Sequence, residues 1–460
     1  MLFVEDTIRA LFRKYETSAK SVIRRNIQIV HNSNQINPSI QEHFKRKYEL
    51  IIARIEDNQR FLNWLLSEPG SDVVEKHNVD SHNSTPALSS TTTTTSMLET
   101  ELTQDEEEMF PSEFDDVLMK ENNTSSDSSN DESYQSGSSY HDGSSFSYQS
   151  STSSSSPSPK KSKSSSKRGV RWGPNTIIDK VLNLFLLVVR DWSSEGLDER
   201  VQSYNPFYAS LERYYPSVEQ RRDIKVICPG AGMGRLPYDI SMLGFHTTLN
   251  ENSLFLIVAL KRIFSGGVND LNSQTLYPFI HQTKNITDEH TQTRRILIPD
   301  IAIGRKDEPG ANMSFAYGDF FDIYSPQVSP ALTSLSTTTI TSNNTNINAN
   351  INANPNTSNK FDCICSSFFI DTVENIFTLI ERFHLILNVG GLWMNNGPLH
   401  YHHDALTSFH LNSTELLDIV RSYNFEILEY KLIDCQYTKN KDSLFQAIFN
   451  CVWFIARKIK

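Results

Sequence analysis

A glycine-rich loop between a short apolar strand and a helix is the feature that most restricts how this chain can fold. The strand is predicted at residues 224–228, the loop runs from Pro229 to Arg235, and the helix follows at residues 236–243. Strands and helices continue to alternate downstream, which implies a doubly wound, Rossmann-like α/β sheet. The other strands are predicted at residues 245–249, 313–317 and 361–365, after the Gly390-Gly391 turn, and in a final hairpin of residues 425–433 and 448–455. The other helices are predicted at residues 177–192, where Pro174 and Asn175 mark the start, and at 253–264 and 373–387.

The spacing of the glycines indicates which ligand the loop holds. Glycine lets the backbone come close to a ligand, and the N-terminus of the following helix favours negative charge. The dinucleotide pattern G-x-G-x-x-G needs a small residue at its last position, where this chain has Arg235. The loop is instead G-x-G-x-G, formed by Gly230, Gly232 and Gly234. This spacing is common in enzymes that use S-adenosylmethionine.

Acidic residues at two further strand ends extend this prediction. Glu251 lies 17 residues after Gly234, at the tip of the second predicted strand, where a carboxylate can accept both ribose hydroxyls of a nucleoside. Asp319 and Phe320 follow the strand at 313–317 and would supply an acceptor for an adenine amino group and an apolar ring beside the base. The alternative is that Asp319 only caps a turn. Because the loop and both carboxylates occur in order at strand ends, the nucleoside-binding interpretation is favoured.

Composition divides the chain into three parts. Residues 1–70 predict a helical N-terminal lobe, with apolar residues at three- and four-residue steps in 4–30 and 38–67. Residues 71–168 are a serine-rich insertion with acidic and basic patches, and we expect disorder because they cannot bury enough apolar area to balance their ordering entropy. Residues 169–460 form the predicted α/β domain, interrupted by a low-complexity loop at 325–360.

Charge and composition argue against several classes of protein. A net charge of −11, from 43 basic and 54 acidic residues, disfavours nucleic acid or an anionic membrane as a partner. Five cysteines without a C-x-x-C pair make a disulfide scaffold or a zinc ribbon unsuitable. No apolar run reaches transmembrane length, so we expect a soluble protein of a reducing compartment. The basic run from Lys160 to Arg168 leaves the nucleus open beside the cytoplasm, since it suits an import signal or a phosphorylatable linker.

A histidine cluster from His400 to Asp404 has the residue types of a metal site. Adjacent residues on one short stretch rarely converge on one ion, and no cysteine pair supports them. We therefore predict no metal, and a solvated loop is the alternative account of these histidines.

Seven segments resemble the carnosine N-methyltransferase family. They are VICPGAGMGRLPYDISMLGF, LNENSLF, LYPFIHQ, MSFAYGDF, FDCICSSFFIDTVENI, GGLWMNNGPLHYHH and CVWFIARK. The resemblance covers about Asn175 to Lys460, apart from the inserted loop. It implies a class I methyltransferase fold, S-adenosylmethionine as the methyl donor, and the imidazole of a histidine-containing dipeptide as the acceptor. Carnosine would be converted to anserine.

The same resemblance implies the residues of the site. Arg190 matches a donor-binding arginine, for the methionine carboxylate. The other implied donor contacts are Gly230, Glu251, Asp319, Phe320 and Ser367, and the implied substrate contacts are Asp371, His402 and Tyr437. Three positions depart from the family pattern: Leu187 replaces a polar donor contact, Ser367 stands where cysteine is frequent, and Phe449 replaces a substrate-binding tyrosine. The lost hydroxyl affects the identity of the dipeptide more than the chemistry.

The chemistry assigns different roles to the predicted catalytic residues, Asp371 and His402. Methyl transfer from a sulfonium is an in-line displacement, and only the neutral form of an imidazole attacks. Asp371 would accept the N–H of the other ring nitrogen, which fixes the tautomer and stabilises the growing positive charge. His402 and Tyr437 would position the acceptor. A methyltransferase acting on histidine within a protein and an inactive, methyltransferase-like interaction protein are the alternatives, and a homodimer is left open.

Overall fold

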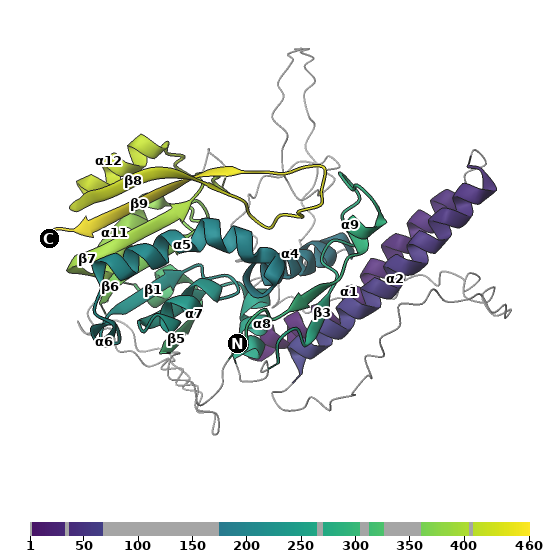
Figure 1. Ribbon diagram of the computed structural model, residues 1–460, viewed down its shortest axis with the longest axis horizontal. Coiled ribbons are helices and arrows are strands. Elements are labelled where there is room, and N and C mark those ends of the chain that lie inside the picture. The colour runs from purple at the N-terminus through teal and green to yellow at the C-terminus, as the bar shows by residue number, and fades with distance from the viewer. Residues whose placement is uncertain are drawn as a thin grey trace, which may run out of the picture.

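The protein is described by a computed structural model that covers residues 2–32, 36–67, 174–264, 270–303, 312–325, 360–403 and 408–460. Its centre is a seven-stranded sheet with the order β5-β2-β1-β6-β7-β9-β8 (Figure 1). The strands are β1 (Lys225–Pro229), β2 (His246–Glu251), β5 (Met313–Tyr317), β6 (Phe361–Ser367), β7 (Leu387–Gly397), β8 (Phe425–Cys435) and β9 (Phe449–Lys458). The pairs from β5 to β7 are parallel, whereas β9 lies antiparallel between β7 and β8. The predicted doubly wound sheet and its final hairpin are confirmed.

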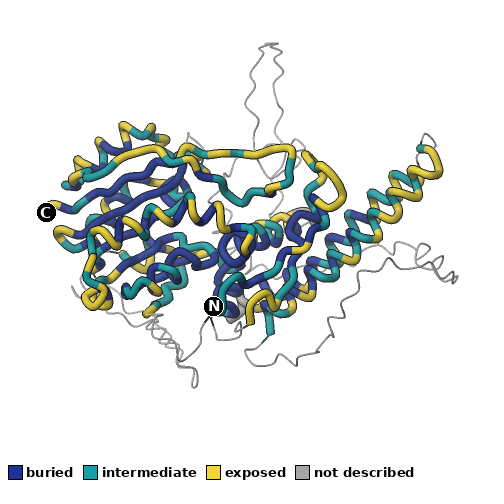
Figure 2. The backbone as a smooth tube through the Cα atoms, viewed as in Figure 1, coloured by how far each residue is buried: buried dark blue, intermediate teal, exposed yellow. Residues whose placement is uncertain are grey.

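Helices cover both faces of this sheet because successive strand residues point to opposite sides. On β6, Ile364 packs into one hydrophobic cluster, while Cys363 and Cys365 pack into another. The first cluster includes side chains of α11 (Ile376–Ile386) and α12 (Ser413–Ser422), and the second includes side chains of α5 (Leu197–Tyr214) and α7 (Arg235–Met242). The central strands are consequently buried between the two helical layers (Figure 2).

The two predicted N-terminal helices are confirmed as α1 (Leu2–His31) and α2 (Pro38–Leu66). They form a hairpin whose far end projects beyond the rest of the described structure (Figure 1). The near end packs on α4 (Pro174–Trp192) and α8 (Leu254–Phe264) in one apolar cluster. Buried Asn58 also exchanges two hydrogen bonds with the backbone of Tyr277, at 2.8 and 2.9 Å. Apolar packing and satisfied polar contacts therefore attach the hairpin, while the predicted division into domains stays a prediction.

Several elements were not predicted. One of them is α5, which contains Pro206 and whose buried hydrophobic side chains are Tyr204, Phe207 and Leu211. Strand β7 begins at Leu387, before the glycines expected to form a turn, because a register shift between Phe361 and Cys363 accommodates them. A small antiparallel sheet lies outside the main one. The remaining elements are β3 (Gln274–Leu276), β4 (Ile296–Ile298), η2 (Ser194–Gly196), α6 (Val218–Arg221), α9 (Glu289–Thr293) and α10 (Phe320–Ile323).

Some predictions fall outside the described residues. They concern the insertion at 71–168 with its basic run, almost all of the loop at 325–360, and Asp404 in the histidine cluster. Within the part that the structure describes, no helix has the length and apolar character needed to cross a membrane.

Candidate functional site

The predicted site residues gather at one edge of the sheet. Strands β1, β2, β5, β6, β7 and β8 run in the same direction, so their carboxyl ends meet there, where doubly wound folds bind ligands. Each of these strands carries a predicted site residue at its carboxyl end or in the segment that follows. In strand order along the chain, the contributions are Gly230, Glu251, Asp319, Ser367, His402 and Tyr437. Arg190 reaches the same region from the last turn of α4.

Two glycines of the loop are needed because a side chain at their positions would clash with neighbouring residues. Gly230 and Gly234 have φ values of +59° and +82°, which favour glycine. A Cβ on Gly230 would lie 2.3 Å from the ring of Phe369, and one on Gly234 would lie 2.9 Å from Leu249 and Phe264. Around Gly232 nothing lies within 4 Å of such an atom. Two of the three glycines therefore serve close packing, and the middle one faces open space.

Glu251 is buried at the tip of β2 and faces this loop. Its Oε2 accepts the Gly232 N–H at 2.8 Å, and its Oε1 accepts the N–H groups of Asn252 and Ser253 at 3.0 and 2.9 Å. A small cavity adjoins this end of the sheet, lined by residues of α8 together with Tyr317 and others. The backbone thus fixes the carboxylate at the tip of β2, and its contact with a ribose stays a prediction.

Asp319 caps a helix, as its alternative interpretation proposed. Its Oδ1 accepts the N–H groups of Phe321 and Asp322 at 2.8 and 3.2 Å, at the start of α10, and the residue is exposed. Phe320 is instead a core residue whose ring contacts those of Phe369 and Phe383. The structure gives both residues a local structural role, and their contact with adenine stays a prediction.

Arg190 is a buried cation at the last turn of α4. Among the described residues, its Nε and Nη2 are buried and make no hydrogen bond. The guanidinium carbon lies 4.7 Å from the ring centre of Tyr437, 5.0 Å from that of Tyr204 and 5.2 Å from that of Phe368. The nearest carboxylate oxygen, on Glu199, is 4.0 Å from Nε. Burial of unpaired guanidinium donors is costly, so the arrangement suits an anionic ligand.

Further buried polar atoms without partners lie near this arginine. Within the described ranges, Ser367 Oγ, Asn396 Oδ1 and Ser203 Oγ belong to this group. Ser367 and Asn396 are register partners on β6 and β7, and Asn396 Nδ2 donates to the Ser203 carbonyl at 3.0 Å. A cation can bind a carboxylate, and hydroxyl or amide oxygens can bind an ammonium group, so this set of atoms suits a ligand that carries both groups.

Asp371 is buried, with 3% of its surface exposed, beside the histidine segment. Its Oδ2 accepts the His400 N–H at 3.1 Å, and its carbonyl accepts the His402 N–H at the same distance. Burial raises the pKa of Asp371 to about 7, although the His400 N–H favours the ionised form. The His402 side chain remains reachable by solvent, yet partial desolvation and the neighbouring histidines lower its pKa. His402 thus meets Asp371 through its backbone N–H, beside a carboxyl group whose pKa is about 7.

Aromatic rings connect this acidic region with Arg190. Tyr437 stacks on Phe368 with ring centres 4.7 Å apart, and the Phe449 ring contacts both Phe368 and His400. Phe368 has a φ of +51°, which is unusual for a bulky residue and is found most often at functional sites. The structure therefore brings Arg190, Tyr437 and the Asp371–His402 region together. Glu251 lies at the same edge, with β1 between its strand and β6.

The histidines of the predicted cluster have separate contacts. His403 Nε2 lies 3.1 Å from the Thr372 carbonyl, while the His400 ring contacts the rings of His402 and Phe449. Over the residues that can be described, no group of three or more histidine, cysteine, aspartate or glutamate side chains could hold a metal ion.

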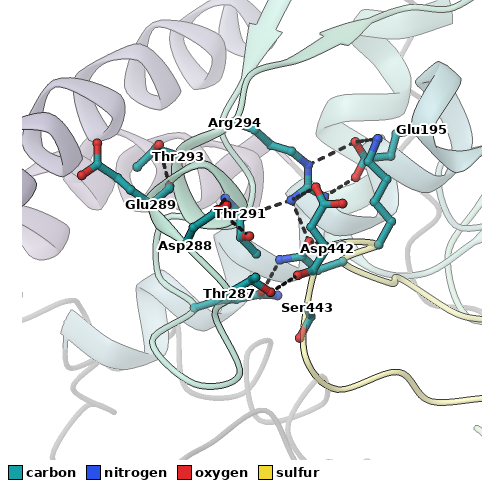
Figure 3. Close-up of polar contacts among 12 residues, drawn as sticks. Glu195, Thr287, Asp288, Glu289, Thr291, Thr293, Arg294, Asp442 and Ser443 are labelled. Atoms are coloured by element: carbon teal, nitrogen blue, oxygen red, sulfur yellow. Dashed lines mark hydrogen bonds and ion pairs between the residues drawn. The ribbon is translucent and has the colours of Figure 1, made fainter.

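Sequence reasoning missed the residues that support the site. Trp192 Nε1 donates to the Met233 carbonyl at 2.8 Å and so ties α4 to the glycine loop. Arg294 anchors the segment after β8, because its Nη1 donates to Asn440 Oδ1 at 2.7 Å. Its Nε also donates to Glu195 at 3.3 Å, a contact that Figure 3 shows. No motif marks these contacts. The three-to-four-residue period of apolar residues in α5 was the available signal for that helix.

The fold and the site define a class I methyltransferase. Its marks are the doubly wound sheet with one antiparallel strand, the glycine loop after β1 and the acidic residue at the end of β2. S-adenosylmethionine is the methyl donor of this class, as the loop predicted. Residues 170–460 match the family model described as carnosine N-methyltransferase, and the chain belongs to this family.

Curated relatives carry the same name. The chain is 32% identical over 288 residues to the carnosine N-methyltransferase of Mus musculus, which covers 61% of this chain and 63% of the relative. It is 31% identical over 285 residues to that of Dictyostelium discoideum, which covers 61% of this chain and 54% of the relative. The match thus spans less than two thirds of either relative. The predicted family is confirmed.

Solved structures give a weaker likeness. The glycopeptide N-methyltransferase MtfA complexed with S-adenosylmethionine has a TM-score of 0.29 and 11% identity, over 56% of this chain and 94% of that one. TehB from Haemophilus influenzae has a TM-score of 0.28 and 16% identity, over 54% of this chain and 65% of that one. With TM-scores this low, neither bears on the site.

Proposed function

We propose that this protein transfers a methyl group from S-adenosylmethionine to an imidazole nitrogen of a histidine-containing dipeptide, converting carnosine to anserine. The observation that carries the proposal is the buried guanidinium of Arg190, whose Nε and Nη2 have no partner among the described residues. The carboxylate of the donor's methionine part would pair with it, and Ser367 and Asn396 could bind the ammonium group. The family to which the chain belongs supports the acceptor.

The residues that would hold the donor fit its three parts. Arg190, Ser367 and Asn396 suit the amino-acid end, Glu251 suits the ribose, and Gly232 leaves open space at the loop. When bound, the donor supplies an electrophilic methyl group on a sulfonium. Asp319 is proposed for the adenine amino group.

Asp371 is proposed to control the protonation of the acceptor. An ionised Asp371 would accept the N–H of the imidazole nitrogen that is not methylated, so that the other nitrogen presents its lone pair. Positive charge grows on the ring during transfer, and the buried carboxylate stabilises that charge. Because burial raises the pKa of Asp371 to about 7, the same carboxylate can take the ring proton that methylation makes acidic.

His402 and Tyr437 are proposed to position the acceptor. Partial desolvation and the neighbouring histidines lower the pKa of His402, so its ring is protonated less readily than a free imidazole and repels the developing cation less. Tyr437, stacked on Phe368, would form an aromatic wall beside the acceptor. Phe449 contributes a ring without a hydroxyl at this wall, and the dipeptide would lack the hydrogen bond that a tyrosine could make.

The test is donor binding followed by transfer of labelled methyl. Purified protein should bind S-adenosylmethionine in calorimetry and should label carnosine, with anserine identified by mass spectrometry. Donor binding without labelled dipeptide, but with a labelled protein band in cell extract, would favour a protein-histidine methyltransferase. A chain that binds no donor would be an interaction protein, and the proposal would be wrong. A cytoplasmic or nuclear location and a homodimer stay proposals.

A further inference from the structure

Glu199 accepts hydrogen bonds from the backbone of the segment after β8, and its carboxylate also lies close to the guanidinium of Arg190. It lies in the first turn of α5 and is buried, with 3% of its surface exposed. Its Oε2 accepts the Thr438 N–H at 2.6 Å, and its Oε1 accepts the Lys439 N–H at 2.9 Å. The same Oε2 lies 4.0 Å from Arg190 Nε. One carboxylate thus holds the segment directly after Tyr437 and, together with Asp191, provides countercharge for Arg190.

The held segment has a conformation that needs support. Thr438 has a φ of +49°, a backbone region that β-branched residues rarely adopt. Such a conformation persists only where surrounding contacts enforce it. The two hydrogen bonds to Glu199 begin at this residue, immediately after Tyr437. They therefore set the direction in which the Tyr437 ring leaves the backbone, toward Phe368 and Arg190.

The distance to Arg190 also matters. At 4.0 Å from Nε, Glu199 is close enough to compensate the buried charge, yet too far to form a hydrogen bond. The Nε and Nη2 donors of Arg190 consequently remain without a partner in the described structure and can pair with a ligand. A direct salt bridge would have occupied them.

We propose that Glu199 is a positioning residue that places Tyr437 on the acceptor side of the site while it leaves the donor-side Arg190 available for its ligand. This inference rests on the proposed function, because it assigns Tyr437 to the acceptor. Glu199 itself touches neither ligand. Its effect on catalysis passes through the backbone of Thr438 and Lys439.

The experiment compares Glu199→Gln with Glu429→Gln. The amide keeps the size of the side chain but offers only one acceptor oxygen to two N–H groups. The KM for carnosine at saturating donor should rise about tenfold, as for a lost hydrogen bond to a charged group, with a smaller change in kcat and in donor affinity. The control breaks a different contact between α5 and β8, in which Glu429 accepts from Arg213 at 2.7 Å. It should leave the KM unchanged.

Two further variants separate positioning from a general loss of structure. In a Tyr437→Ala background, Glu199→Gln should raise the KM by less than twofold, because coupled residues are not additive. Glu199→Asp retains the charge but shortens the reach, and it should raise the KM in the same direction if the glutamine variant does not fold. A full effect in the Tyr437→Ala background, or equal effects of the glutamine variant and its control, would overturn the inference. Failure of the wild-type protein to methylate carnosine would instead contradict the proposed function.

Discussion

Replacement of Asp371 by asparagine should stabilise the protein while it removes most of the turnover. The side chain is buried, and its Oδ2 accepts the His400 N–H at 3.1 Å. Asparagine has the same shape and can keep that acceptor oxygen, but it carries no charge. The variant therefore isolates the effect of a buried, ionisable carboxyl group on stability and on catalysis.

The size of the stability effect follows from the pKa of Asp371, which burial raises from 3.8 to about 7. At about 1.36 kcal/mol per pKa unit, this rise corresponds to roughly 4 kcal/mol. The protonated carboxyl contributes this stability below pH 4, and the contribution is lost as the pH rises through the folded-state pKa near 7. Asparagine does not titrate. The advantage of the variant over the wild type should thus be about 2 to 3 kcal/mol larger at pH 8 than at pH 5.

Whereas Asp371→Asn should raise the stability, it should lower kcat. Without the carboxylate, no negative charge faces the imidazole as it becomes positive. Loss of one such interaction lowers kcat by about 100- to 1,000-fold. Donor affinity should change little, because the contacts proposed for the donor are at Arg190, the glycine loop and Glu251.

Urea unfolding at pH 5 and pH 8, together with calorimetric donor binding and a labelled-methyl assay, measures all three quantities. Other groups titrate in both proteins, so the difference between the proteins isolates Asp371. Asp418→Asn is a suitable control, since Asp418 is exposed and pairs with Arg421 on the surface of α12. A stability difference that is equal at the two pH values would refute the burial argument. Turnover close to that of the wild type would refute the catalytic role.

Three other predictions concern the donor side and the pH dependence. Arg190→Met should weaken donor binding at least about tenfold in calorimetry, because it removes a buried cation whose Nε and Nη2 lack partners in the described structure, and it should also lower the melting temperature, because buried Glu199 loses a countercharge. Gly230→Ala should cost about 1 to 3 kcal/mol more in urea unfolding than Gly232→Ala, since only the former places a methyl group against Phe369; equal costs would contradict this packing. The kcat/KM for the acceptor should rise from pH 6 to pH 8 as the acceptor's imidazole and Asp371 lose protons. In Asp371→Asn, only the rise caused by deprotonation of the imidazole should remain.

The sheet and the donor end of the site could be predicted because their signals lie within short stretches of sequence. The strand, glycine loop and helix at 224–243 occupy consecutive residues, and Glu251 is identified by its place at the end of the next strand. Parallel pairing then puts the carboxyl ends of β1, β2, β5, β6 and β7 at one edge of the sheet. Asp319 was more ambiguous, because a capping residue and a ligand contact look alike in sequence, and the structure shows the cap.

The sequence alone determined the class of fold, the family and most of the residues at the sheet edge, because local patterns and motifs encode them. Only the tertiary structure showed that Arg190 is buried with two donors that have no partner among the described residues, that Asp371 is desolvated, and that Glu199 holds the segment after Tyr437. These properties depend on what packs around each group. Glu199 and Thr438 are far apart in the chain, and they meet only because α5 crosses the sheet beside the end of β8. No spacing in the sequence encodes such a contact.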